Sequence, residues 1–238
     1  ADDDDPDTAE TVGTTTTSTS STTTTTTSPS TTTTTAPAAT TTTVAPTSTT
    51  STVPAGRRCV VRLHGKGGDG TDTWVDDGIT FVSPRGNARG WDGRQWLYFP
   101  EREYAEAVAV VADAIADEGC GPVIINGFSN GGAFAAKLYC RGETFGRRVI
   151  GVVIDDPVVD SAVLDCKPAP GVDVTLYWTG YLERTARPGW NCKDEDWTCE
   201  GGRTIGIDAY EDALGVTAKE SPYDEHRWYE DAPEITRF

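Results

Sequence analysis

A serine between paired glycines is the feature of this sequence most able to do chemistry. Residues 127–131 read Gly-Phe-Ser-Asn-Gly, and they separate the apolar run 122–126 from a helical pattern that continues to residue 140. The pattern G-x-S-x-G between a buried strand and a helix is typical of a sharp turn that presents the serine hydroxyl as a nucleophile. An ordinary glycine-rich turn is the alternative at Ser129. No Gly-Lys-Ser or Gly-Lys-Thr follows, which disfavours a phosphate-binding loop.

A serine hydroxyl needs a base, because it is a weak nucleophile at its free pKa. The chain has only two histidines, His64 and His226, so one of them must serve if Ser129 is catalytic. His64 lies in Leu-His-Gly-Lys-Gly-Gly-Asp-Gly, directly after an apolar run, and His226 lies near the end of the sequence. Two histidines and no C-x2-C pair disfavour a zinc site. The sequence implies no metal and no organic cofactor.

The elements around these residues alternate between short apolar runs and helical patterns. The runs 59–63, 79–82, 122–126, 149–154 and 172–178 predict buried strands, and a last strand falls within 216–223. Apolar residues at steps of three and four predict a helix over 102–118, a second helix follows Ser129, and Pro233 suits the first turn of a short terminal helix. The sequence therefore predicts an α/β fold whose central, mostly parallel sheet is flanked by helices.

The two glycine-rich loops resemble those of the α/β-hydrolase fold. Gly-Phe-Ser-Asn-Gly-Gly with Leu-His-Gly upstream is similar to secreted esterases of the polyhydroxybutyrate depolymerase and feruloyl esterase type, over roughly residues 57–230. The resemblance implies a serine hydrolase that cleaves carboxylic esters, including bulky, aryl or polymeric ones, with a triad in the chain order serine, acid, histidine. That order makes His226 the base and gives His64 to the oxyanion-hole loop. The oxyanion would be held by the backbone amides of Asn130 and Lys66.

The triad acid has several candidates. In similar hydrolases it follows the strand after next from the serine, and Glu183 occupies that position where an aspartate is usual. Asp156 and Asp155, at the end of the preceding strand, are the rivals, because some hydrolases place the acid there. Other candidates are Asp194 and Asp196. We rank Glu183 first and Asp156 second.

Six cysteines, an even number, suit an oxidising compartment. Two of them, Cys192 and Cys199, lie in one polar loop, where a local bridge is the economical pairing. The strand order that the resemblance implies would bring Cys59 beside Cys120 at the far edge of the sheet. The remaining pair, at the end of the helix after Ser129 and after the next strand, is Cys140 with Cys166.

Aromatic residues recur in or beside the loops expected at the active-site edge. We expect Trp74, Trp178 and Tyr181 to line a site for an acyl or aryl group. Trp91, Trp96 and Trp190 fall in similar places, although for any single tryptophan a packing role is the more common one. The folded part has little room for a cap domain, so we expect an open cleft.

Composition divides the chain into two parts. Threonine and serine fill most of residues 8–52, behind an acidic start, so we expect a disordered, Thr/Ser-rich extracellular linker over 1–53 and one catalytic domain over 54–238. A net charge of −17 argues against nucleic acid as a partner, and the sequence has no apolar run long enough for a transmembrane segment. We expect a secreted monomer, tethered to a cell surface through the linker. An acyltransferase, an amidase and an inactive adhesion domain are the alternatives.

Overall fold

The computed structural model describes residues 53–90, 92–181 and 205–238. The linker predicted over 1–53 lies outside these ranges except for its last residue, and so do Trp91, Trp190 and the pair Cys192 and Cys199. Among the described residues, no helix combines the length and the apolar character needed to cross a membrane.

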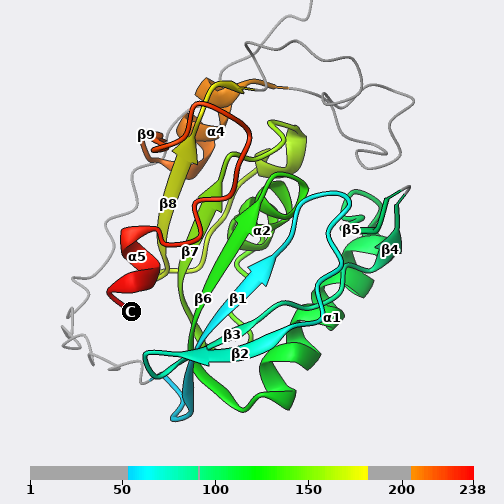
Figure 1. Ribbon diagram of the computed structural model, residues 1–238. Helices are drawn as coiled ribbons and strands as arrows, with labels where there is room; N and C mark the ends of the chain where they lie inside the picture. The colour runs from blue at the N-terminus through cyan, green and yellow to red at the C-terminus, as the bar shows by residue number, and fades with distance from the viewer. Residues whose placement is uncertain (1–52, 91, 182–204) are drawn as a thin grey trace, which may run out of the picture. The chain divides into compact units, whose positions relative to one another are not determined.

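A seven-stranded sheet runs through the domain in the order β2-β3-β1-β6-β7-β8-β9. All neighbouring strands pair in parallel except β2, which runs antiparallel to β3 at one edge. The parallel strands end at a common edge, which their arrowheads mark in Figure 1, whereas β2 runs the opposite way. Their bounds are β1 Arg57–Leu63, β2 Thr73–Asp76, β3 Ile79–Val82, β6 Cys120–Phe128, β7 Val149–Asp155, β8 Asp173–Trp178 and β9 Lys219–Glu220.

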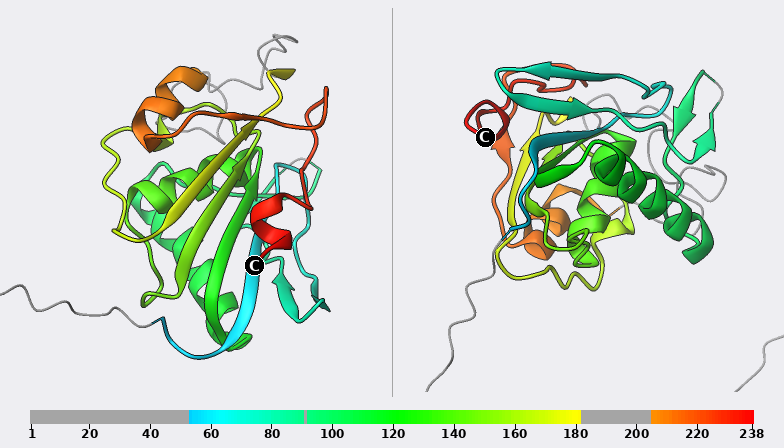
Figure 2. Two further views of the ribbon diagram at one scale, coloured as in Figure 1. Left: turned by 90° about the vertical axis from the view of Figure 1, so that its left-hand side faces the viewer. Right: turned by 90° about the horizontal axis from the view of Figure 1, so that it is seen from below.

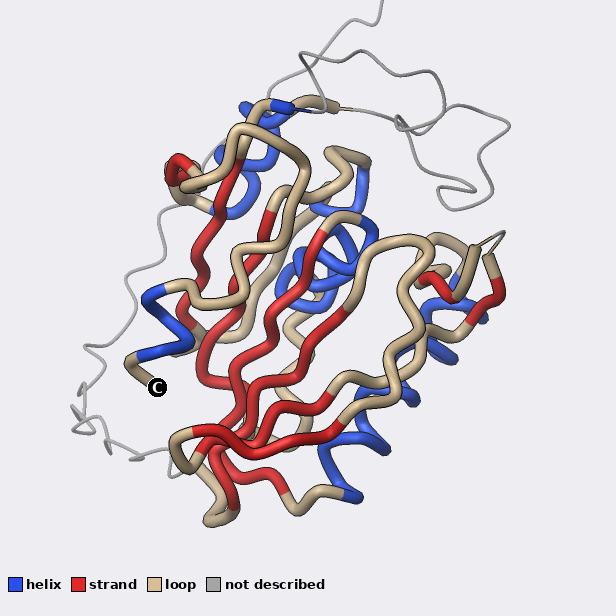
Figure 3. The backbone as a smooth tube through the Cα atoms, in the orientation of Figure 1, coloured by secondary structure: helices blue, strands red, loops and turns tan. Residues whose placement is uncertain are grey.

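Helices cover the two faces of the sheet unequally. Helices α1 and α2 pack on one face with the larger hydrophobic core, whereas α5 and the C-terminal segment cover the other face with a smaller one (Figure 2). The tube drawing shows the same layers around the strands (Figure 3). The helices are α1 Glu101–Asp117, α2 Asn130–Cys140, the 3-10 turn η1 Ser161–Val163, α4 Ile207–Leu214 and α5 Pro233–Thr236, and a separate hairpin joins β4 Ala88–Arg89 to β5 Arg94–Gln95.

The predicted helix over 102–118 is confirmed as α1, whose buried stripe includes Tyr104, Val111 and Ile115. The five predicted apolar strands are also confirmed, because a parallel sheet covered on both faces demands continuous apolar runs. Strand β2 and helix α4 were not predicted. All four residues of β2 are exposed, so the strand carries no apolar pattern that would reveal it.

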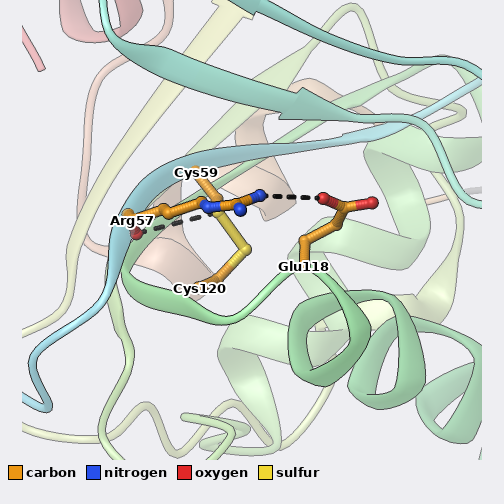
Figure 4. The surroundings of a disulfide bond; sticks show 4 residues. All are labelled: Arg57, Cys59, Glu118 and Cys120. Atoms are coloured by element: carbon orange, nitrogen blue, oxygen red, sulfur yellow. Dashed lines mark hydrogen bonds and ion pairs between the residues drawn. A yellow bond between two sulfur atoms is a disulfide. The ribbon is translucent and has the colours of Figure 1, made fainter.

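Two disulfides connect the strands and helices as predicted. Cys59 on β1 is bonded to Cys120 at the start of β6, and Cys140 at the end of α2 is bonded to Cys166. Figure 4 shows the first bridge beside an exposed ion pair of Arg57 with Glu118, at 3.4 Å. Because exposed pairs of this kind contribute little to stability, the covalent bond is the stronger constraint there.

Loss of the first bridge should lower the free energy of unfolding substantially. Cys59 and Cys120 are 61 residues apart, and closing a loop of this length stabilises a fold by about 4 kcal/mol in the chain-entropy account. We expect the double variant Cys59→Ala/Cys120→Ala to show a loss of this order in urea unfolding followed by circular dichroism. An unchanged midpoint would contradict the expectation.

Candidate functional site

Ser129 occupies a strained turn between β6 and α2. Its backbone angles are φ 55° and ψ −119°, a conformation that costs a residue with a side chain on the order of 1–3 kcal/mol. The turn is held by two backbone hydrogen bonds, because Ser129 N donates to Asp155 O at 3.1 Å and Val158 N donates to Ser129 O at 3.2 Å. The strand, sharp turn and helix predicted for a nucleophilic serine are therefore all present.

The glycines on either side of Ser129 make this turn possible. A Cβ atom on Gly131 would lie 2.0 Å from the carbonyl oxygen of Leu63, and one on Gly127 would lie 2.2 Å from the carbonyl oxygen of Gly131. Both distances are far shorter than a carbon atom can approach an oxygen atom. Strands β1 and β6 and helix α2 therefore come together at a point where only glycine fits.

His226 is bonded to a buried carboxylate. Its Nδ1 lies 2.5 Å from Oδ2 of Asp156, and the side chains of His226 and Asp156 are 7% and 0% exposed. Asp156 directly follows β7, has a φ of 41°, and accepts further hydrogen bonds from Thr179 N at 3.0 Å and Thr179 Oγ1 at 2.8 Å. These bonds fix both carboxylate oxygens. A carboxylate held in this way orients the ring and keeps the proton on Nδ1.

The partner of His226 is thus the carboxylate that the sequence ranked second. Glu183, ranked first, lies outside the described residues, as do Asp194 and Asp196. Asp156 gains its place because the register of β7 against β6 sets Asp155 opposite Phe128, so that the next residue of each strand enters the same edge. The sequence alone does not decide whether the partner of His226 is one of two adjacent aspartates at a strand end or the glutamate after the following strand.

The segment after His226 is anchored to the sheet face that lies opposite α1 and α2. Trp228 Nε1 donates to Asn126 Oδ1 at 2.9 Å, and Tyr229 N donates to Asp155 Oδ2. The imidazole of His226 packs on the ring of Phe128, at 4.6 Å between centroids. Phe128 immediately precedes Ser129, so these contacts bring the histidine to the edge where the serine lies. Neither Asn126 nor Trp228 is evident as a functional residue from the sequence, where the only signal is that Asn126 is a polar residue at the end of an apolar run.

Asp155 differs from its neighbour Asp156 in role. Its side chain is fully buried and turned to the C-terminal segment, and burial raises the pKa of Asp155 to about 7. The bond from Tyr229 opposes this rise and the charge of Asp156 adds to it. The carboxyl of Asp155 is therefore partly protonated near neutral pH. It also positions the chain that carries His226.

His64 is a structural residue of the loop after β1. Gly86 N donates to its Nε2 at 3.1 Å, so Nδ1 carries the proton and donates to Gly65 O at 2.8 Å. Burial lowers the pKa of His64, which keeps the ring neutral. The ring thus ties two loops together and cannot serve Ser129 as a mobile base. A Cβ on Gly65 would lie 3.1 Å from Ser129 Cβ, so the His64 loop closes directly on the serine.

The two residues predicted for the oxyanion hole flank this contact. Asn130 is the first residue of α2, where the backbone N–H groups have no partner within the helix. Its side chain is tied to the backbone of Trp96, through 2.7 Å and 3.1 Å hydrogen bonds. Lys66 follows Gly65 in this loop. The next two backbone N–H groups, of Gly67 and Gly68, donate to the carbonyls of Arg94 and Gly65.

The predicted aromatic residues fall in three different environments. Trp178 ends β8, and Tyr181 N donates to Thr179 Oγ1, so both lie beside the residue that holds Asp156. Trp74 stacks on Phe81 at the β2 edge, at 4.9 Å. Trp96 is fully buried in the core and stacks on an α2 phenylalanine rather than lining a cleft.

Within the described ranges, no three His, Cys, Asp or Glu side chains gather in a group that could hold a metal ion. The sheet edge carries instead a serine at the end of β6, a carboxylate after β7 and a histidine of the C-terminal segment, of which the carboxylate and the histidine are hydrogen-bonded. Such a set can carry out nucleophilic catalysis.

Comparison with solved structures identifies the architecture. A carboxylesterase from Bacillus cereus is 17% identical, with a TM-score of 0.52 over 76% of this chain and 86% of that one. The chain has the α/β-hydrolase fold. A protein of unknown function from Agrobacterium tumefaciens is 20% identical over 78% of this chain and 91% of that chain (TM-score 0.46), and an inhibited esterase B from Lactobacillus rhamnosis is 14% identical over 76% and 74% (TM-score 0.38). No family model and no curated protein matches the chain.

The contacts at the serine turn predict a large effect of one added methyl group. Gly131→Ala should destabilise the domain strongly, because the new Cβ meets backbone atoms that cannot move independently. We expect a loss above about 3 kcal/mol, comparable to the severe end of single substitutions. Urea or thermal unfolding measures it.

Gly151→Ala on β7 is the matched control, since a Cβ there would lie 3.6 Å from the nearest side chain. Its stability should change much less. Equal losses for Gly131→Ala and Gly151→Ala would contradict the packing account.

Proposed function

We propose that the protein is a serine hydrolase that cleaves carboxylic esters through an acyl-enzyme. The hydrogen bond between His226 and Asp156, at the same edge as the strained Ser129, is the observation that carries this proposal. The shared fold with a carboxylesterase supports esters over other acyl compounds. The more specific resemblance to polyhydroxybutyrate depolymerases and feruloyl esterases stays a prediction.

In the proposed reaction, Ser129 Oγ attacks the ester carbonyl while His226 Nε2 accepts its proton. Asp156 keeps the other ring nitrogen protonated and stabilises the imidazolium that forms. His226 then returns the proton to the departing alcohol oxygen. Water enters by the same route, with His226 again as base, and releases the carboxylic acid and free Ser129.

The negative charge that develops on the carbonyl oxygen needs two donors. We assign them to the backbone amides of Asn130 and Lys66. The first lies at the N-terminus of α2, where the helix dipole also favours negative charge. The second lies in the loop that His64 holds against Ser129. Loss of one such donor typically costs about 10²- to 10³-fold in rate.

The proposed substrates are bulky esters with an aryl or polymeric acyl group. Trp178 and Tyr181 lie next to Thr179 and would contact the acyl group, whereas Trp74 would contact a more remote part of a long substrate. The two disulfides are compatible with an extracellular enzyme, and the Thr/Ser-rich residues before the domain would tether it.

Replacement of the acid distinguishes the two ranked carboxylates. Asp156→Asn should lower kcat/KM for p-nitrophenyl butyrate by about 10³- to 10⁴-fold, because an amide stabilises the wrong tautomer of His226. Ser129→Ala should abolish the acyl-enzyme route altogether. Initial rates of p-nitrophenol release measure both.

Glu183→Gln serves as the matched control and should retain most of the activity. The proposed triad would be wrong if Glu183→Gln lost activity while Asp156→Asn kept it. Full activity of Ser129→Ala would overturn the proposed function itself.

A further inference from the structure

A cavity lies at the other end of helix α2 from the proposed active site. It encloses 520 Å³, within the range of small-molecule sites. Its walls come from the C-terminal half of α2, from Phe99 just before α1, from η1 and from the segment next to the Cys140–Cys166 bridge. Lys137 lines it together with Phe99, Arg141, Leu164 and Lys167.

This cavity is separate from the triad. None of Ser129, Asp156 and His226 contributes to its lining. Lys137 follows Ser129 by eight residues, which at about 1.5 Å of rise per residue places it roughly 12 Å further along the helix. A ligand in this cavity would not occupy the site where the ester reacts.

Lys137 is a buried cation with incomplete compensation. The residue is 6% exposed, and its ammonium donates one hydrogen bond, to the carbonyl of Tyr98. Its Nζ also lies 4.7 Å from the ring centroid of Phe99 and 5.1 Å from that of Tyr104, which are cation–π contacts. Among the described residues, no carboxylate approaches it within ion-pair distance.

An ammonium group has three donors, so the bond to Tyr98 leaves two for a ligand. Burying a charge without a full set of partners is costly, and an anion in the cavity would offset that cost. Burial lowers the pKa of Lys137 to about 8, so the group still carries its charge at neutral pH.

Basic side chains dominate the charged part of the lining. Among the described lining residues, Arg141 and Lys167 join Lys137, and Asp165 is the single acid. Arg141 is also paired with Glu101 on the surface, so it adds less than a free cation would. A positive cavity contrasts with the chain as a whole, whose net charge is −17.

We propose that this cavity binds a small organic carboxylate, with the carboxylate on the Lys137 ammonium and the apolar part against Phe99 and Leu164. The apolar wall distinguishes such a ligand from inorganic phosphate, and the buried cation distinguishes it from a neutral molecule. The site does not depend on the proposed esterase activity, and its ligands include the class of acids that ester hydrolysis releases.

Calorimetric titration of benzoate into the full chain tests the proposal. Benzoate should bind with a Kd on the order of 1 mM, and benzamide, of the same shape but neutral, should not bind detectably. Lys137→Gln should weaken benzoate binding by about tenfold or more, as expected for loss of a charged hydrogen bond. Lys167→Gln should weaken it by about twofold, and Lys219→Gln, outside the cavity, should have no effect.

A chemical readout covers the case in which Lys137→Gln fails to fold. Benzoate should slow acetylation of Lys137 by sulfo-N-hydroxysuccinimide acetate, mapped by mass spectrometry, without slowing that of Lys219. The proposal is overturned if benzoate and benzamide bind alike, if phosphate binds more tightly than benzoate, if neither binds, or if both lysines are protected equally. Repeating the titration with Ser129→Ala separates this result from the fate of the proposed function.

Discussion

The close approach of backbone atoms around Ser129 is the constraint on which the rest of the structure depends. A carbonyl oxygen of β1 lies only 2.0 Å from where the Cβ of residue 131 would be, and a carbonyl oxygen of α2 lies 2.2 Å from where that of residue 127 would be. This contact fixes the crossing of α2 over the sheet, and the crossing forces Ser129 into its strained conformation. The strained residue is the one that we propose as the nucleophile, and the surrounding parallel strands hold its conformation in place.

The sheet edge also explains how distant residues meet. Ser129, Asp156 and Thr179 each follow a neighbouring parallel strand, so they arrive together without long loops. His226 comes from a segment with little regular structure, and specific side chains hold that segment instead. Asn126 and Asp155 bind it from the sheet, and the Phe128 ring packs on the imidazole. The buried polar residues Asn126 and Asp155, which lie in otherwise apolar strands, thus hold the segment that carries His226.

Much of this arrangement was predictable from the sequence, for physical reasons. Buried parallel strands must be apolar throughout, so β1, β3, β6, β7 and β8 were evident, and the serine turn needs its glycines. The partner of His226 was harder, because the choice between Asp156 and Glu183 depends on strand register and loop path rather than on residue type. Strand β2 is exposed on all its residues and gave no signal. In the sequence, Lys137 occupies what looks like an ordinary polar position of a helix. Only its packing against Phe99 and Tyr104 in the structure shows that its ammonium is buried.

The central claim is that Ser129 is a nucleophile activated by His226. Reaction of the full chain with a fluorophosphonate, followed by mass mapping of the modified peptide, tests it most directly. The account predicts one adduct, on Ser129, and a labelling rate that falls by about 10³-fold or more in His226→Ala, because the hydroxyl then lacks its base. Absence of the adduct, or labelling of Ser129 at the same rate without His226, would contradict the account.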